Sequence, residues 1–270
     1  MIFEAKKRAL VMAVINLTPD SFYENSRVTA DRAVEAALKA VANGADILDL
    51  GAQSTAPGSK EITAREELAR LITPLKEIRK AVNVPISVDT FYPQVAGQAL
   101  ESGADIINDV SGRADPEMAR LAAKHNAGWV VMHTGKLNSS QEGKYESGVI
   151  NDINLFFEKA IATAEAAGLS KESLCLDPGI GFGKSREDDL EIVSRFAEFQ
   201  KHGCVTMGAL SRKRVTRLCG DALTGTIALN TVCILGGAGI IRVHDVEQAA
   251  AQVKMLSALK GEHALGQNNC

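Results

Sequence analysis

Polar and charged side chains recur at the ends of short apolar runs in this sequence. Asp89, Asn108 and Asp177 each close one such run, and Arg242 and His244 close the last one. Carboxylates and carboxamides can exchange hydrogen bonds with a flat heterocycle that is rich in N–H groups. The planar fork of an arginine suits phosphate oxygens. Together these residue types indicate a site that holds a polar ring and an anion, although any one of them alone is equally explained as a turn or a helix cap.

Further candidates for the anion end lie on two other segments. Lys213 follows the seventh apolar run beside Ser211, and the carboxamide of Asn16, which ends the first run, can ligate a metal ion carried by the anion. Lys213, Arg242 and His244 would face that anion. A solvated basic turn is the alternative explanation for residues 212–214. The segment 179–184 is rich in glycine but lacks the spacing of a phosphate-binding P-loop, so its alternative explanation is a flexible loop.

The apolar runs are typical of parallel strands buried on both faces, because each is rich in Ile, Val or Leu with little alternation. The eight predicted strands are Ala9–Ile15, Asp46–Leu50, Pro85–Val88, Asp105–Asn108, Gly128–Met132, Ser173–Leu176, Cys204–Met207 and Gly239–Val243. The segments between them have the period of helices. The predicted helices are Ala30–Ala42, Ala64–Val82, Pro93–Ser102, Pro116–His125, Ile150–Ala167, Asp188–Lys201, Leu223–Leu235 and Val246–Leu259. Thr63 and Glu66 form a capping box at the start of the second helix.

The alternation of strands and helices predicts an α/β fold, a single-domain (β/α)8 (TIM) barrel. The repeat of Asn43–Leu48 in Ser102–Ile107 supports one β/α unit used many times. An open doubly wound sheet is the alternative, and the absence of a G-x-G-x-x-G motif after the first strand weakens its dinucleotide-binding version. Active sites of such barrels lie at the carboxyl ends of the strands. All the polar strand ends should therefore share one rim.

Composition excludes several classes of function. The 270 residues carry a formal net charge of −3, and aromatic residues make up 4%, so neither bulk charge nor aromatic stacking favours a nucleic-acid binder. No apolar stretch approaches the roughly 20 residues of a membrane helix. The residues Met1–Lys7 contain no apolar signal core, which predicts a cytoplasmic protein. Residues 1–260 are expected to form the barrel, and 261–270 a flexible C-terminal tail.

The strand-end strings closely resemble those of dihydropteroate synthases, and the resemblance extends from residue 9 to about residue 258. Six strings carry it in the same order along the chain. They are Asn16–Phe22, Ile86–Thr90, Ile106–Val110, Leu176–Lys184, Ser211–Lys213 and Arg242–Val246.

The resemblance implies a transferase of folate biosynthesis that joins 6-hydroxymethyl-7,8-dihydropterin diphosphate to 4-aminobenzoate, releasing diphosphate and 7,8-dihydropteroate. It assigns the pterin ring to Asp89, Asn108, Asp177 and Lys213. It assigns the diphosphate to Asn16, Arg242 and His244, with Mg2+ at Asn16. It assigns the 4-aminobenzoate side to Thr55, Pro57, Phe182 and Ser211. The catalytic set would be Asp89, Asp177, Lys213, Arg242 and His244.

The same resemblance implies a target of sulfonamides and a homodimer, with the helix at Leu223–Leu235 as the expected interface. This sequence also departs from the family pattern. Ala56 stands where an arginine is usual, Gln53 where a glutamate is common, and Tyr23–Ser26 and Thr134–Lys136 replace other loop strings. A weakly active pterin-binding paralogue and a pterin-dependent methyltransferase are therefore the alternative functions. A methyl donor needs no diphosphate site, which argues against the second.

Overall fold

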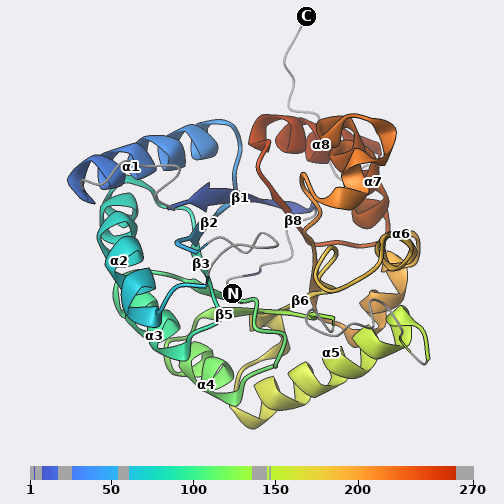
Figure 1. The fold of residues 1–270 in the computed structure, drawn as a ribbon, viewed down its shortest axis with the longest axis horizontal. Helices are drawn as coiled ribbons and strands as arrows, with labels where there is room; N and C mark the ends of the chain where they lie inside the picture. The colour runs from blue at the N-terminus through green and yellow to red at the C-terminus, as the bar shows by residue number, and fades with distance from the viewer. Residues whose placement is uncertain are drawn as a thin grey trace, which may run out of the picture.

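Eight parallel strands close into a barrel that a ring of helices surrounds (Figure 1). The computed structural model describes Phe3 and residues 8–17, 26–53, 61–135, 145 and 147–259. Each strand pairs in parallel with the next one along the chain, and the eighth pairs with the first. The predicted single-domain (β/α)8 barrel is confirmed, and the alternative of an open doubly wound sheet is wrong because no strand edge is left between the first and last strands.

The described elements follow in strict alternation. The strands are β1 (Leu10–Asn16), β2 (Ile47–Gly51), β3 (Ile86–Thr90), β4 (Ile106–Asp109), β5 (Gly128–Met132), β6 (Leu174–Asp177), β7 (Val205–Gly208) and β8 (Ile240–Val243). The helices are α1 (Ser26–Ala42), α2 (Ala64–Ala81), α3 (Pro93–Glu101), α4 (Pro116–Lys124), α5 (Val149–Ala166), α6 (Arg186–Ser194), α7 (Ala222–Leu235) and α8 (Val246–Leu259). Three short 3-10 helices are η1 (Lys171–Ser173), η2 (Phe196–His202) and η3 (Arg214–Cys219).

Local sequence signals set most of the helix boundaries. The capping box predicted for α2 is present, because the Thr63 side chain accepts a hydrogen bond from the Glu66 backbone N–H and the Glu66 carboxylate accepts one from the Thr63 backbone N–H. The helix predicted at 188–201 is wrong in extent. It consists of α6 and then η2, because the tighter 3-10 winding places Phe196 and Phe199 on one side, where both are buried.

The side chains of the strands alternate between the lumen of the barrel and the surrounding helices. On β4, for example, Ile106 belongs to the cluster inside the barrel, and Ile107 packs in the layer against the helices. Phe3 joins the inner cluster and lies against Gly128, so closely that a Cβ at Gly128 would be 2.8 Å from the Phe3 ring. The lumen is therefore a packed apolar core at the level of these residues.

Other properties concern the chain as a whole. Among the described residues, Cys175, Cys204 and Cys233 are free and buried, and Cys219 is free and exposed. None of the helices in the described part of the chain is long and apolar enough to cross a membrane. The predicted tail at 261–270 lies outside the described residues. The cytoplasmic location stays a prediction.

Replacing Phe3 with alanine should remove part of the inner core. We expect Phe3→Ala to lower the free energy of unfolding by about 3 kcal/mol, the scale of a large-to-small change at a buried aromatic. Urea unfolding followed by circular dichroism measures this change. Leu155→Ala is the control, because Leu155 is exposed on α5 and should cost under about 0.5 kcal/mol. Equal effects of the two variants would contradict a packed role for Phe3.

Candidate active site

The alternation of the strands places the polar residues of the sequence prediction inside the barrel, directly beyond its apolar core. Asn108 lies on the same face of β4 as Ile106, and Arg242 on the same face of β8 as Ile240. Asp89 on β3 is the register partner of Asn108. Three of the predicted site residues, brought in from three strands, therefore line one mouth of the barrel.

Arg242 is the centre of this arrangement. Its Nε donates a hydrogen bond to Oδ2 of Asp49 at 2.6 Å, and its Nη2 donates to Oδ2 of Asp89 at 2.7 Å. The Asn108 side chain donates to the same Asp49 oxygen at 3.1 Å. Both carboxylates are buried, so the guanidinium offsets charges that would otherwise repel each other. Asp49 lies within the predicted strand Asp46–Leu50 but is not among the site residues predicted from the sequence, and its alternation with Ile47 is the signal that could have assigned it to the site.

Several buried polar atoms beside Arg242 have no hydrogen-bond partner in the described structure. They are Oδ1 of Asp49, Oδ1 of Asn108 and Oγ of Ser87. Buried polar groups in folded proteins are almost always paired, because an unpaired one loses its hydration without compensation. Unpaired acceptors at the mouth of a barrel therefore indicate a place for a ligand that carries hydrogen-bond donors.

A third carboxylate and a lysine lie on the β6 side of the same mouth. Asp177 accepts a hydrogen bond from the Gly179 backbone N–H at 2.8 Å. The Lys213 ammonium donates to the carbonyl of Ile180 and lies 4.3 Å from the centre of the Phe182 ring. Burial raises the pKa of Asp177, while the charges of Lys213 and Arg242 act in the opposite direction. Lys213 and Arg242 both lie close enough to Asp177 to lower its pKa. The residues predicted to hold the ring and those predicted to face the anion are therefore near one another.

Electrostatics at the site differ from what the residue types suggest. Burial lowers the pKa of Lys213 to about 8, against the attraction of Asp177. Burial also raises the pKa of Asp89 to about 7, even though the Arg242 guanidinium lowers it. His244 was grouped with the cations in the sequence. Burial and the nearby arginines lower its pKa to about 4, so its imidazole is neutral at pH 7.

His244 and Ser211 form a pair at the ends of the last two strands. Ser211 Oγ is 3.1 Å from His244 Nδ1 and also accepts a hydrogen bond from the His244 backbone N–H. The neighbouring Arg212 instead forms an exposed ion pair with Asp245 and has a positive φ of 60°. A solvated basic turn thus describes Arg212, whereas the Lys213 ammonium points to Ile180 and Phe182.

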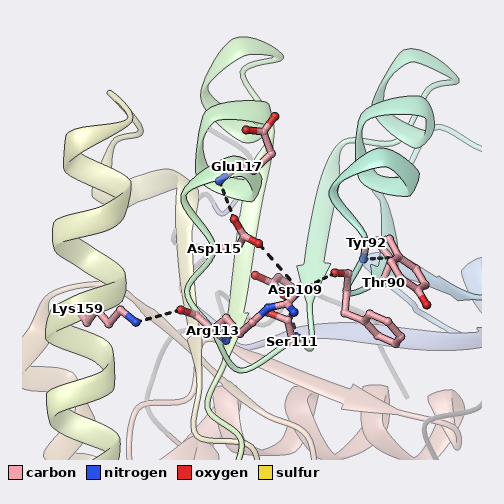
Figure 2. Close-up of polar contacts among 9 residues, drawn as sticks. Thr90, Tyr92, Asp109, Ser111, Arg113, Asp115, Glu117 and Lys159 are labelled. Carbon is pink, nitrogen blue, oxygen red and sulfur yellow. Dashed lines mark hydrogen bonds and ion pairs between the residues drawn. The ribbon is translucent and has the colours of Figure 1, made fainter. Parts of the chain in front are cut away.

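Two other polar strand ends point away from the lumen. Asp109 accepts a hydrogen bond from the Ser111 backbone N–H, and Figure 2 shows it beside Ser111 in the segment that leads from β4 to α4. His133 contacts the Asp152 carboxylate of α5 at 2.9 Å. Burial lowers the pKa of His133 to about 4. Asp109 therefore fixes the loop after its strand, and His133 fastens α5 to the end of β5.

The remaining predicted residues lie at the β1 and β2 ends. Asn16 is exposed at the end of β1 and is the register partner of Gly51. Thr55 and Pro57, together with the unusual Ala56, lie outside the described residues.

Two buried ionisable residues near the rim were not found from the sequence. Lys184 ends the glycine-rich segment after β6 and is buried. Glu67 is buried in the first turn of α2, where burial raises its pKa to about 7. The sequence signal for Glu67 was weak, because acidic residues in a first helical turn are usually explained by the helix dipole.

The family model described as pterin binding enzyme matches residues 12–244. The dihydropteroate synthase of Bacillus subtilis is 37% identical over 94% of this chain and 90% of its own length. The chain belongs to the dihydropteroate synthase family of pterin-binding enzymes. A probable bifunctional folylpolyglutamate synthase/dihydropteroate synthase of Haloferax volcanii is 38% identical over 92% of this chain, which spans only 30% of that longer protein.

Solved structures agree with this assignment. The dihydropteroate synthase of Clostridium difficile, determined in the presence of pteroic acid, superposes with a TM-score of 0.89. It is 35% identical, and the match covers 95% of this chain and 98% of that one. The chain is therefore an enzyme, a transferase of folate biosynthesis.

Removing the central guanidinium should destabilise the fold in a pH-dependent way. We expect Arg242→Met to lower the free energy of unfolding by about 3 kcal/mol at neutral pH, since it leaves Asp49 and Asp89 buried without compensation. The loss should be larger at about pH 8 than at about pH 5, because the raised pKa of Asp89 lets it take up a proton in acid. Urea unfolding at the two pH values measures both effects.

Arg212→Met is the matched control for this prediction. It breaks an arginine–carboxylate pair of similar length, but Arg212 is exposed, so the loss should stay below about 1 kcal/mol. A loss for Arg242→Met no larger than that of the control would contradict the central role of Arg242.

Proposed function

We propose that this enzyme joins 6-hydroxymethyl-7,8-dihydropterin diphosphate to 4-aminobenzoate, forming 7,8-dihydropteroate and diphosphate. The observation that carries the proposal is the set of buried, unpaired acceptors on Asp49 and Asn108 beside the charge-compensated Arg242. A pterin ring offers several N–H donors in one plane. Its heteroatoms also fit the carboxylate of Asp177 and the ammonium of Lys213 on the opposite side of the mouth.

The diphosphate is assigned to the β1 and β8 ends of the rim. The Nη1 of Arg242 has no hydrogen bond to any of the described residues, so it remains available for a phosphate oxygen. His244 would contribute hydrogen bonds as a neutral imidazole rather than a positive charge. The positive charge at this end then comes from Arg242 and Lys213.

The donor set at this end also fits Mg2+. In the described part of the chain, no three His, Cys, Asp or Glu side chains gather as metal ligands. Magnesium often takes only one or two protein oxygens and completes its shell with substrate phosphates and water. The exposed carboxamide oxygen of Asn16 is one such ligand. When bound, Mg2+ would neutralise charge on the departing diphosphate.

The reaction breaks the bond between the pterin methylene carbon and the diphosphate oxygen, and forms a bond from that carbon to the amine nitrogen of 4-aminobenzoate. The nitrogen then loses one proton. Arg242 and Lys213 stabilise the charge that grows on the leaving diphosphate. The carboxylates of Asp89 and Asp177 stabilise the positive charge that spreads into the pterin ring. No covalent bond to the protein is needed.

The 4-aminobenzoate side is assigned to Phe182 and Ser211, together with Thr55 and Pro57 of the second loop. Phe182 offers an aromatic face next to Lys213, and Ser211 a hydroxyl at the rim. The match to a relative solved in the presence of pteroic acid supports 4-aminobenzoate as the second substrate, because pteroic acid contains a pterin joined to 4-aminobenzoate. Sulfonamides would compete at the same side.

The decisive test is product formation. We expect the purified protein, incubated with the pterin diphosphate, Mg2+ and labelled 4-aminobenzoate, to form labelled dihydropteroate. Asp177→Asn keeps the shape but removes the charge, and should weaken pterin binding by about 1.5–3 kcal/mol, roughly tenfold to a hundredfold. Calorimetry with the pterin diphosphate in the absence of 4-aminobenzoate measures this change. Wild-type affinity in the variant would remove Asp177 from the pterin site, and no product from the unaltered protein would overturn the proposed reaction.

We further propose that the enzyme is a homodimer that buries one face formed by η3, α7 and α8, which pack together. The helix α7 contains no charged residue, and a helix that is apolar all round is normally buried. Most of the large apolar side chains that are exposed in the described chain lie in this region. The apolar face consists of Leu218, Val232, Leu235, Met255 and Leu259.

A charge placed on this face should separate the subunits. We expect Leu235→Glu to convert a dimer into a monomer at micromolar concentration, because a carboxylate cannot be buried there without a partner. Light scattering during size-exclusion chromatography measures the mass against the 28.7 kDa of one chain. Leu155→Glu, on the exposed side of α5, is the control and should leave the mass unchanged. A monomeric unaltered protein would contradict the proposed dimer.

A further inference from the structure

The glycine-rich segment between β6 and α6 is held in place by a buried lysine. Lys184 is only 6% exposed. Its ammonium donates hydrogen bonds to the carbonyl of Gly179 at 2.8 Å and to the carbonyls of Phe182 and His133 at 3.3 Å each. One side chain thus ties both ends of its own loop to the end of the neighbouring strand β5. These contacts argue against a flexible loop, the alternative considered for this segment.

Backbone contacts join the same two segments. The Gly135 N–H donates to the Phe182 carbonyl at 3.0 Å, and the His133 N–H donates to the Asp177 carbonyl at 2.9 Å. Gly179 has a positive φ of 67°, and a Cβ there would lie 1.7 Å from the His133 carbonyl oxygen. The approach of the loop to β5 therefore requires glycine at this position.

Two groups of the loop contact Lys213. The Ile180 carbonyl accepts the hydrogen bond of the Lys213 ammonium, and the Phe182 ring lies beneath that ammonium. On the far side of the loop, the Gly181 N–H donates to the buried carboxylate of Asp189 at 2.7 Å. The position of Phe182 thus depends on how the loop is fastened.

Burying the Lys184 ammonium costs free energy, because no carboxylate in the described structure pairs with it directly. Burial lowers the pKa of Lys184 to about 7, against the more distant attraction of Asp177 and Asp189. An ammonium has three N–H donors and can bind three backbone carbonyl oxygens at once, which an apolar side chain cannot do.

We propose that Lys184 is a positioning residue of the reaction. It fastens the β6–α6 loop and so holds the Phe182 ring in the position that binds 4-aminobenzoate. The hydrogen bonds of the Lys184 ammonium all go to backbone carbonyls, so the proposal assigns it no substrate contact. Of the groups assigned to the pterin, Asp49, Asp89 and Asn108 lie on strands and do not depend on it, whereas Asp177 and Lys213 also contact the loop through Gly179 and Ile180. This inference rests on the proposed function and specifies how one substrate is selected.

Steady-state kinetics of Lys184→Met in the full-length enzyme test the proposal. We expect the KM for 4-aminobenzoate to rise about tenfold or more and the KM for the pterin diphosphate to rise at least about threefold less, because the loop carries Phe182 while Asp49, Asp89 and Asn108 stay fixed on their strands. Asp189→Asn loosens the same loop from the α6 side. It should shift the two KM values in the same unequal way but to a smaller extent, which keeps the test valid if Lys184→Met folds poorly. Lys80→Met, at an exposed position on α2, is the control and should change neither value.

A purely structural role gives a different result. It would lower the amount of active enzyme, and hence the apparent kcat, in both loop variants while leaving both KM values unchanged, and that outcome would overturn the inference. Equal rises in both KM values would overturn it as well. Failure of the unaltered protein to form product would instead overturn the proposed reaction, and this inference with it.

Discussion

A single guanidinium shared by two buried carboxylates is the interaction on which the site depends. Arg242 contacts Asp49 and Asp89 inside the barrel, where two carboxylates without a cation would repel each other and lack hydration. The guanidinium compensates one carboxylate charge, and burial raises the pKa of Asp89 to about 7, which reduces the other. Unpaired acceptors remain beside it, notably on Asn108. Such a surface favours a neutral ring with N–H donors over an anion. In the proposed function, the mouth of the barrel binds a pterin and its outer edge provides cationic groups for the diphosphate.

The geometry of the closed barrel brings these groups together. Consecutive side chains of a strand point to opposite sides, so the positions beyond the apolar inner cluster are the ones that face the mouth. Asp49, Asp89, Asn108 and Arg242 all occupy such positions, whereas Asp109 and His133, one residue out of phase, face the helices. A one-residue change of register would exchange the two sets. The strand pairing is thus part of the catalytic apparatus.

Burial also changes the chemical character of residues whose types alone suggest simpler roles. His244 is a neutral hydrogen-bonding group instead of a cation, and Lys213 holds its proton less firmly than an exposed lysine. The Lys184 ammonium donates its hydrogen bonds to backbone carbonyls. Fewer residues than the sequence suggests therefore supply positive charge to a leaving diphosphate in the proposed reaction. The replacement of the usual arginine by Ala56 then matters more for diphosphate binding.

Local patterns in the sequence determined the eight strands, the closed α/β architecture, the start of α2 and the rim on which the polar residues lie, because strand burial, capping and period are encoded by neighbouring residues. The same patterns misjudged the helix at 188–201, where the packing of Phe196 and Phe199 sets the winding. The pairing of Arg242 with Asp49, 193 residues away, was decided only by the tertiary structure. So were the burial of Lys184 and Glu67 and the neutrality of His244. Partners distant in sequence and removal from water set these properties, and neither is written in the local order of residues.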